Sequence, residues 1–291
     1  MKPAPFDYYA PSTLEEVLAL LGQHGDEAKL LAGGQSLMPL INMRLARPAV
    51  LVDINRLPGL DYIREDDGMI AIGALTRHAS VASSNVLKKS CPMLPHAAQF
   101  VGDLQVRNRG TFGGSIAHAD PASEFCAVVY TLGGEIVARH AGGSRVIPVE
   151  EFFEAPLTTA LTPREIATEV RVARIKGAAW SFRGIAPRFG DFVLAGVGIA
   201  LDFDGEGRCG ACRVGMFGVG PTPLRAYKAE QSCVGNRLDE KLIVELAELA
   251  ATEADPSSDV HASAGYRREL LRWLVGWNLR NASRKHQEEM K

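Results

Sequence analysis

The sequence lacks the features that mark several large classes of protein. Its five cysteines are odd in number and irregularly spaced, which argues against a disulfide scaffold and is typical of reduced thiols. It has no run of about eighteen or more apolar residues, so no transmembrane helix is predicted. The first residues, MKPAPFDYY, lack the apolar core of a signal peptide. These absences predict a cytoplasmic protein without membrane insertion.

The sequence also lacks an excess of either charge. It has 32 Lys and Arg against 34 Asp and Glu, for a net charge of −2. No basic field favours nucleic acid, so we expect no nucleic-acid partner. With 46% hydrophobic and 23% charged residues, the composition is that of an ordinary globular protein. A chain of 291 residues fits one large domain or two to three small ones.

Two glycine-rich segments, about eighty residues apart, are the most informative part of the sequence. They read KLLAGGQSLMPL (29–40) and RNRGTFGGSIAHADPASE (107–124), and each has a Gly-Gly step followed by a hydroxyl residue. Glycine lets a ligand approach the backbone, so both segments are predicted to be loops that present N–H groups to one anion. Together they can clamp a pyrophosphate between two lobes. The residues alone leave nucleotide binding and two ordinary glycine turns as equal alternatives.

Hydrophobic periodicity predicts an α+β chain rather than a regular βαβ series. A capping box at Ser12-x-x-Glu15 is predicted to open the first helix, and Thr76 to cap another. Further helices are predicted over 37–45, 77–83, 92–101, 123–132, 239–253 and 266–282. Strands are predicted over 29–32, 50–54, 69–72, 135–140, 145–149, 164–173, 193–203 and 210–219. The Gly-, Pro- and Arg-rich stretch 176–191 predicts two domains, 1–175 (lobes 1–55 and 56–175) and 176–291.

The CxxC pair Cys209 and Cys212 has two interpretations. It can be a redox pair or half of a metal site, or it can be two ordinary cysteines of a strand. On a regular strand, residues three apart point to opposite faces, so we predict that the pair cannot bind one ion. The sequence has no second CxxC or His pair at zinc spacing and no iron–sulfur framework, and Cys91, Cys126 and Cys233 are taken as incidental thiols. No metal site is predicted.

Three pieces of the sequence carry a family resemblance. They are AGGQS (32–36), VRNRGTFGGSIAHADPASE (106–124) and Asp191-Phe192 before an apolar strand. The chain resembles, over nearly its whole length, the FAD-binding medium subunit of the molybdenum hydroxylases, the group containing carbon monoxide, xanthine and nicotine dehydrogenases. The resemblance implies a bilobed FAD-binding domain of the vanillyl-alcohol-oxidase (PCMH) type. It also implies a small C-terminal α+β domain of the CO dehydrogenase flavoprotein type, a sheet backed by helices.

The resemblance further implies that the FAD pyrophosphate lies between the two glycine-rich segments. Because the flavin carries the redox chemistry, no catalytic residue is expected from the protein. Ala167 and Arg183 match positions near the flavin ring or ribityl chain, and Phe192 matches an aromatic position near the isoalloxazine. The full set of implied FAD-contacting residues is Lys29, Leu30, Leu31, Ala32, Gly33, Gly34, Gln35, Ser36, Leu37, Val101, Gly102, Gly110, Thr111, Gly113, Gly114, Ser115, Ala117, His118, Ser123, Glu124, Ala167, Arg183 and Phe192.

The sequence departs from the commonest family pattern at two positions. Gln35 stands where His or Asn is frequent, and Phe112 where Ile is usual. Both residues flank expected backbone contacts, so cofactor binding should survive the changes. Arg183 often is Lys in relatives, which keeps the positive charge.

The function implied by the resemblance is electron transfer within a heterotrimer. A large subunit would carry molybdopterin and a small subunit two [2Fe–2S] clusters, in a dimer of heterotrimers. Electrons would reach FAD in this chain and leave to an external acceptor. Two alternatives remain: a stand-alone flavin reductase or oxidase of the same fold, and a non-catalytic nucleotide-binding module. The substrate and the acceptor stay open.

Overall fold

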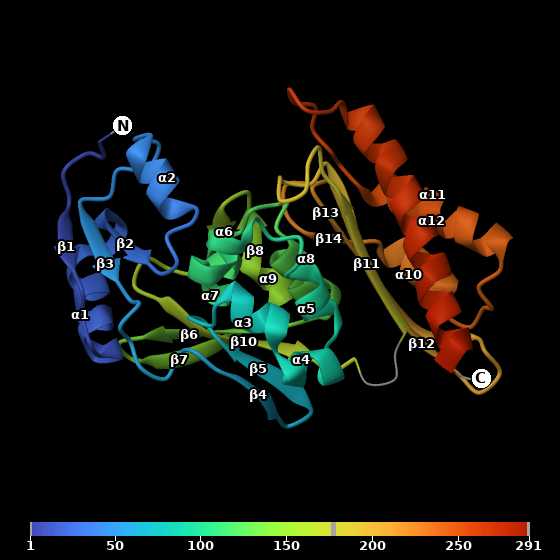
Figure 1. The fold of residues 1–291 in the computed structure, drawn as a ribbon, viewed down its shortest axis with the longest axis horizontal. Helices are drawn as coiled ribbons and strands as arrows, with labels where there is room; N and C mark the ends of the chain where they lie inside the picture. Colours follow the sequence, from blue (N-terminus) through green and yellow to red (C-terminus); the bar gives the residue numbers. More distant parts are fainter. Residues whose placement is uncertain (1, 176–178, 290–291) are drawn as a thin grey trace.

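The computed structural model describes residues 2–175 and 179–289, in three parts that follow one another along the chain (Figure 1). The N-terminal lobe is blue in Figure 1, the middle lobe runs from cyan to yellow-green, and the C-terminal unit runs from yellow to red. Within the described ranges, no helix is both long and apolar enough to cross a membrane. The predicted boundary at 175/176 adjoins residues 176–178, which lie outside the described residues.

The N-terminal lobe is a small parallel sheet with a helix packed on it. The strand order is β1-β3-β2. The elements are β1 (Asp7–Tyr9), α1 (Leu14–His24), the 3-10 turn η1 (Gly25–Glu27), β2 (Ala28–Leu31), α2 (Leu37–Asn42) and β3 (Val50–Asp53). The predicted capping box is displaced by one residue, because the cap is Thr13, whose Oγ1 accepts a hydrogen bond from Glu16 N at 3.2 Å. This register buries Val17 and Leu21 against the sheet.

The middle lobe is a five-stranded antiparallel sheet with helices over one face (Figure 1). Its strands, in sheet order, are β4 (Ile63–Asp66), β5 (Met69–Gly73), β10 (Ile166–Ala173), β6 (Glu135–His140) and β7 (Gly143–Pro148). Its helices are α3 (His78–Ser83), α4 (Asn85–Ser90), α5 (Met93–Ala97), α6 (Leu104–Arg109), α7 (Phe112–His118), α8 (Glu124–Thr131) and α9 (Val149–Phe152). A short hairpin, β8 (Phe153–Ala155) and β9 (Thr158–Thr159), follows α9. The fully buried rings of Phe112, Phe125 and Phe152 fill the core between helices and sheet.

Two local predictions in the middle lobe are wrong. The second glycine-rich segment is mostly helical, forming α6 and α7, instead of an open loop. Thr76 does not cap α3, whose cap position is Arg77 without a side-chain bond. The Thr76 hydroxyl is bound instead to the backbone of Tyr62, accepting from its N–H at 3.1 Å and donating to its carbonyl at 3.0 Å.

The C-terminal unit is a four-stranded antiparallel sheet backed by helices. The strands, in sheet order, are β11 (Ala179–Ile185), β12 (Ala195–Phe203), β13 (Cys209–Phe217) and β14 (Leu224–Arg225). The helices α10 (Tyr227–Cys233), α11 (Glu240–Glu253) and α12 (Ala264–Glu289) cover one face, and α5 and α8 of the middle lobe pack on the other (Figure 1). Sequence analysis missed β11, because it lies in the stretch interpreted as a domain boundary.

Candidate functional site

A cavity of about 610 Å³ lies between the N-terminal and middle lobes, and the segment 190–192 of the C-terminal unit forms part of its wall. A volume of this size is typical of a cofactor or substrate site. All predicted site residues line it except Leu31 and Arg183. Further lining residues that were not predicted to contact FAD are Leu40, Ala46, Ile54, Ala74, His78, Phe100, Val106, Asp120, Leu157, Leu161, Glu165, Ile166, Gly190 and Asp191.

The two glycine-rich segments touch each other at the cavity. Gly33 is buried, and a Cβ atom added there would lie 2.7 Å from the Cα of Gly110 and would also meet the carbonyl oxygen of Arg109. Real Cβ atoms do not approach backbone atoms this closely, so only glycine fits. The next residue, Gly34, has φ +72, a left-handed conformation that glycine adopts without strain. The first Gly-Gly step therefore has a packing reason and a conformational reason.

The first segment leaves a run of backbone N–H groups without partners among the residues that the structure describes. Within the described residues, no acceptor is found for the N–H groups of Gly33, Gly34, Gln35 and Ser36, although all four residues line the cavity. The segment leads directly into the N-terminus of α2, which adds partial positive charge. Consecutive N–H groups facing one space are a common way of binding a phosphate group. Binding of a pyrophosphate by this segment stays a prediction.

The second segment does not present its Gly-Gly amides in the same way. Gly113 donates its N–H to the carbonyl of Ala74 at 2.9 Å, and Gly114 donates to Thr111 Oγ1 at 3.2 Å. Ser115 N–H is bound to the Thr111 carbonyl at 3.0 Å. The prediction that this step offers free N–H groups is therefore wrong, because the segment folds as the first turn of α7. Its glycines serve close packing, which leaves small residues on this wall.

A partly buried polar link joins the two segments, and sequence analysis missed it. Asn55 Nδ2 donates to the carbonyl of Ala32 at 2.7 Å in the first segment. Its Oδ1 accepts from Arg77 at 2.8 Å, and Arg77 also donates to the carbonyl of Arg109 at 2.5 Å in the second segment. We call Asn55 and Arg77 the brace. The sequence offered one signal for this link, an Asn directly after the predicted strand 50–54. That strand runs parallel to the strand before the first segment.

Three titratable side chains of the cavity, Glu124, His118 and His78, have pKa values shifted toward their neutral forms. Burial raises the pKa of Glu124 to about 8, and the nearby Asp120 adds to this shift. Burial lowers the pKa of His118, although Asp120 opposes it. Burial also lowers the pKa of His78 to about 4, and its Nε2 lies 2.9 Å from the carbonyl of Thr111. A neutral carboxyl group in Glu124 can donate a hydrogen bond to a ligand.

The three residues that were matched to the flavin end of the site have different outcomes. Ala167 is buried on β10 beside a register shift, and it lines the cavity. Phe192 also lines the cavity, with 71% of its surface exposed. Arg183 does not line it, because its guanidinium lies over the Trp277 ring of α12, 4.5 Å from the ring centre. This position differs from the one the resemblance implied, so we leave Arg183 out of the candidate site.

A second cavity of about 840 Å³ adjoins the first on the side of Phe192. The two share Asp120, Gly190, Asp191 and Phe192. The remaining wall comes mostly from the C-terminal unit and includes the buried Arg267, which donates to Asp259 at 2.7 Å. A ligand in the second cavity would therefore approach the Phe192 end of the first.

Two family models match consecutive parts of the chain, and the first covers more than half of it. Residues 4–174 match the FAD-binding domain in molybdopterin dehydrogenase, and residues 180–281 match the CO dehydrogenase flavoprotein C-terminal domain. The 6-hydroxypseudooxynicotine dehydrogenase complex subunit alpha of Paenarthrobacter nicotinovorans is 40% identical over 283 residues, covering 97% of this chain and 96% of its own. The carbon monoxide dehydrogenase medium chain of Hydrogenophaga pseudoflava is 34% identical over 276 residues, covering 94% and 96%.

Solved structures give the same result. A carbon monoxide dehydrogenase from Hydrogenophaga pseudoflava that lacks the Mo-pyranopterin moiety of its cofactor matches with a TM-score of 0.94 and 36% identity, covering 97% of this chain and 98% of the other. Quinoline 2-oxidoreductase from Pseudomonas putida 86 matches with a TM-score of 0.93 and 33% identity, covering 98% and 99%. The expected fold, an FAD-binding domain followed by a C-terminal α+β domain, is thus confirmed.

Proposed function

The chain belongs to the family of FAD-binding subunits of molybdenum-containing dehydrogenases, and from this we propose that it binds FAD in the first cavity as the electron-transfer subunit of such an enzyme. The four unpartnered N–H groups of residues 33–36 are the observation that carries the assignment. They would supply the hydrogen-bond donors that a pyrophosphate needs, and the close contact between Gly33 and Gly110 admits no side chain at Gly33. The residues present therefore fit the cofactor.

Each wall of the cavity has a separate task in this proposal. The first segment would bind the pyrophosphate through backbone N–H groups, and the brace would hold the second segment against it. Glu124, neutral at pH 7 because of its raised pKa, would donate a hydrogen bond without adding negative charge next to a phosphate. Bound FAD would supply the redox chemistry, accepting electrons from a partner's iron–sulfur clusters and passing them to an external acceptor. No protein nucleophile takes part.

The partners follow from the same family. We propose a large molybdopterin subunit, a small subunit with [2Fe–2S] clusters, and a dimer of heterotrimers in the cytoplasm. The exposed Phe192 and the adjoining second cavity support entry of the external acceptor at that end. Oxidation of the organic or inorganic substrate would take place on the large subunit, because no catalytic group is needed here.

The test is native purification of the protein through a tag on this chain, followed by a visible spectrum and mass identification of the co-purifying chains. We expect flavin absorption overlaid by broad iron–sulfur absorption, with one large and one small partner. A flavin spectrum on a lone chain would favour a stand-alone flavoenzyme. A colourless chain that takes up no added FAD would overturn the proposal and favour a non-catalytic module.

A further inference from the structure

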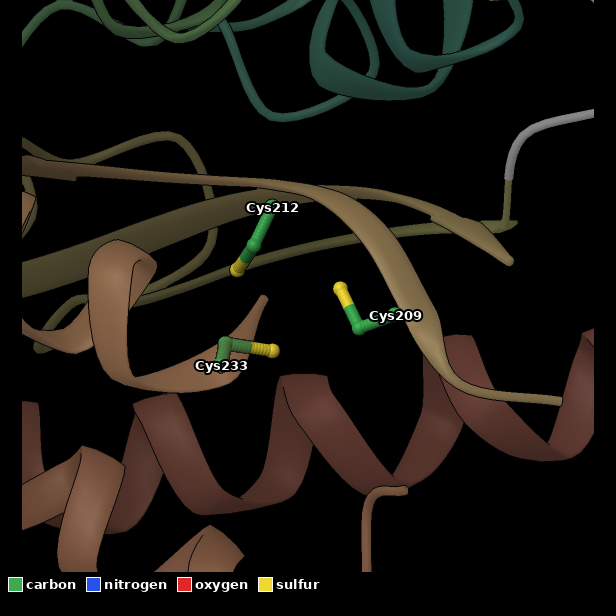
Figure 2. A group of neighbouring side chains, drawn as sticks. All are labelled: Cys209, Cys212 and Cys233. Carbon is green, nitrogen blue, oxygen red and sulfur yellow. The ribbon is translucent and has the colours of Figure 1, made fainter. Parts of the chain in front are cut away.

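Three buried cysteines meet in the core of the C-terminal unit. None of them lines the FAD cavity. Cys209 and Cys212 lie on β13, and Cys233 is the last residue of α10. Their exposed fractions are 1%, 7% and 0%. The three Sγ atoms all lie within 4.8 Å of one another, and Figure 2 shows the side chains pointing toward a common centre. We call them the thiol trio.

A β-bulge brings Cys209 and Cys212 to the same face, so the prediction that they point to opposite faces is wrong. Along β13 the register passes from Cys209, opposite Phe203, to Ala211, opposite Asp202. Gly210 is therefore an extra residue without a partner on β12, and it reverses the alternation of side chains. The prediction assumed regular pairing, and one extra residue is enough to invert it.

The turn after α10 is fixed to the same point of the strand. Cys209 N–H donates to the carbonyl of Asn236 at 2.8 Å, and Gly235 N–H donates to the Cys209 carbonyl at 2.7 Å. Asn236 N–H in turn binds the carbonyl of Cys233 at 3.2 Å. Gly235 has φ +81, which allows the chain to turn back toward β13. The backbone thus holds the third thiol against the first two without help from the sulfur atoms.

The described surroundings provide three ligands and no fourth acidic, histidine or cysteine side chain. The nearest carboxylate along α10, Glu230, is already engaged, binding Arg225 at 2.5 Å and accepting from Val214 N at 2.8 Å.

We propose that Cys209, Cys212 and Cys233 form a three-thiolate site for one thiophilic d10 cation. Soft thiolate ligands select Cu(I) and Zn²⁺ among the common metals. Structural zinc sites almost always take four protein ligands, so the three-ligand set favours Cu(I). Binding releases the thiol protons, and the cation offsets part of the charge of the three buried thiolates, one unit for Cu(I) and two for Zn²⁺. The bound ion would tie α10 to β13.

The experiment uses the natively purified, reduced protein under anaerobic conditions. Metal content is measured by mass spectrometry as isolated, and again after separate loading with Cu(I) or Zn²⁺ and removal of free ion. We expect one equivalent of one cation per chain, three sulfur neighbours by X-ray absorption at its edge, and a raised unfolding temperature. The cation whose loading leaves one equivalent bound per chain, after free ion is removed, is the one that the site takes. This readout does not depend on FAD, so it is independent of the proposed function.

The variants are Cys209→Ala, Cys212→Ala and Cys233→Ala, with Cys91→Ala as the matched control because Cys91 is equally buried, in the middle lobe. Each trio variant should retain the cation at least tenfold more weakly, and the control should match the wild type. If an alanine variant does not fold, retention of the cation is measured on the serine variant at the same position and compared with the stoichiometry of the wild type. Failure to retain either cation, equal retention by all variants, or a disulfide within the trio in the isolated protein would overturn the proposal.

Discussion

Replacing Gly33 with alanine tests whether the contact between the two glycine-rich segments shapes the FAD site. The new methyl group would lie 2.7 Å from Gly110 Cα and against the Arg109 carbonyl, and backbone atoms cannot rotate away. Overpacking of this kind typically costs about 1–3 kcal/mol. The segments must separate to admit the methyl group, and separation moves the free N–H groups of residues 33–36.

If the whole cost falls on the cofactor-bound state, the affinity for FAD drops about 5- to 150-fold. The assay is titration of the deflavinated protein with FAD, followed by flavin fluorescence, with thermal unfolding of the same samples. The control is Gly22→Ala on α1, where an added Cβ meets nothing within 4 Å. That change should leave the FAD affinity alone and stabilise the helix by about 0.5–1 kcal/mol. An unchanged dissociation constant and unchanged unfolding in Gly33→Ala would refute the reasoning.

Three further predictions concern the brace and two buried carboxyl groups. Arg77→Met removes charge-assisted hydrogen bonds, one of them to Asn55, and should weaken FAD binding by about 1–3 kcal/mol in the same titration. If Arg77→Lys weakens FAD binding as much as Arg77→Met does, the forked geometry of the guanidinium is needed. Glu124 keeps a proton in the folded state between its ordinary pKa of 4.5 and about 8, so the unfolding free energy falls as pH rises through that window. In urea titrations, the unfolding free energy of Glu124→Gln should fall by roughly 3–5 kcal/mol less than that of the wild type over this pH range. An equal fall in the two proteins would contradict this. Arg145 binds Glu165 at 2.7 Å and holds its pKa at about 2, so Arg145→Met should destabilise the protein at pH 7, by an amount that shrinks as pH falls from 4.5 toward 2; equal destabilisation at pH 7 and pH 3 would count against this.

Elements whose signal is local were predictable from the sequence. The hairpin of β6 and β7, the strand β3 and the helices α8 and α11 all lie within a few residues of their predicted ranges, because apolar spacing and turn residues agree there. The cap of α1 shows the limit of such signals. Ser12-x-x-Glu15 and Thr13-x-x-Glu16 are equal as patterns, and burial of the helix against the sheet selects the second.

Features that depend on pairing across the chain were not predictable in the same way. The bulge at Gly210 is defined by the pairing of β13 with β12, so the spacing of Cys209 and Cys212 alone does not show that both lie on one face. Arg183 was placed by its match to a family position, yet its side chain packs on an aromatic ring of α12. Of the 23 residues predicted to contact FAD, 21 line the cavity, but the hydrogen bonding of the N–H groups depends on how the two segments fold.

If FAD binds the backbone N–H groups of residues 33–36 as proposed, the stability of the folded chain depends on the supply of the cofactor. A ligand that binds only the folded state stabilises it by RT ln(1 + [L]/Kd), about 2.7 kcal/mol at a hundredfold excess over Kd. A chain synthesised when FAD is scarce would open more often, and proteases act on the opened state. Scarcity of the vitamin precursor would then lower the amount of the subunit in the cell before it slowed any electron transfer.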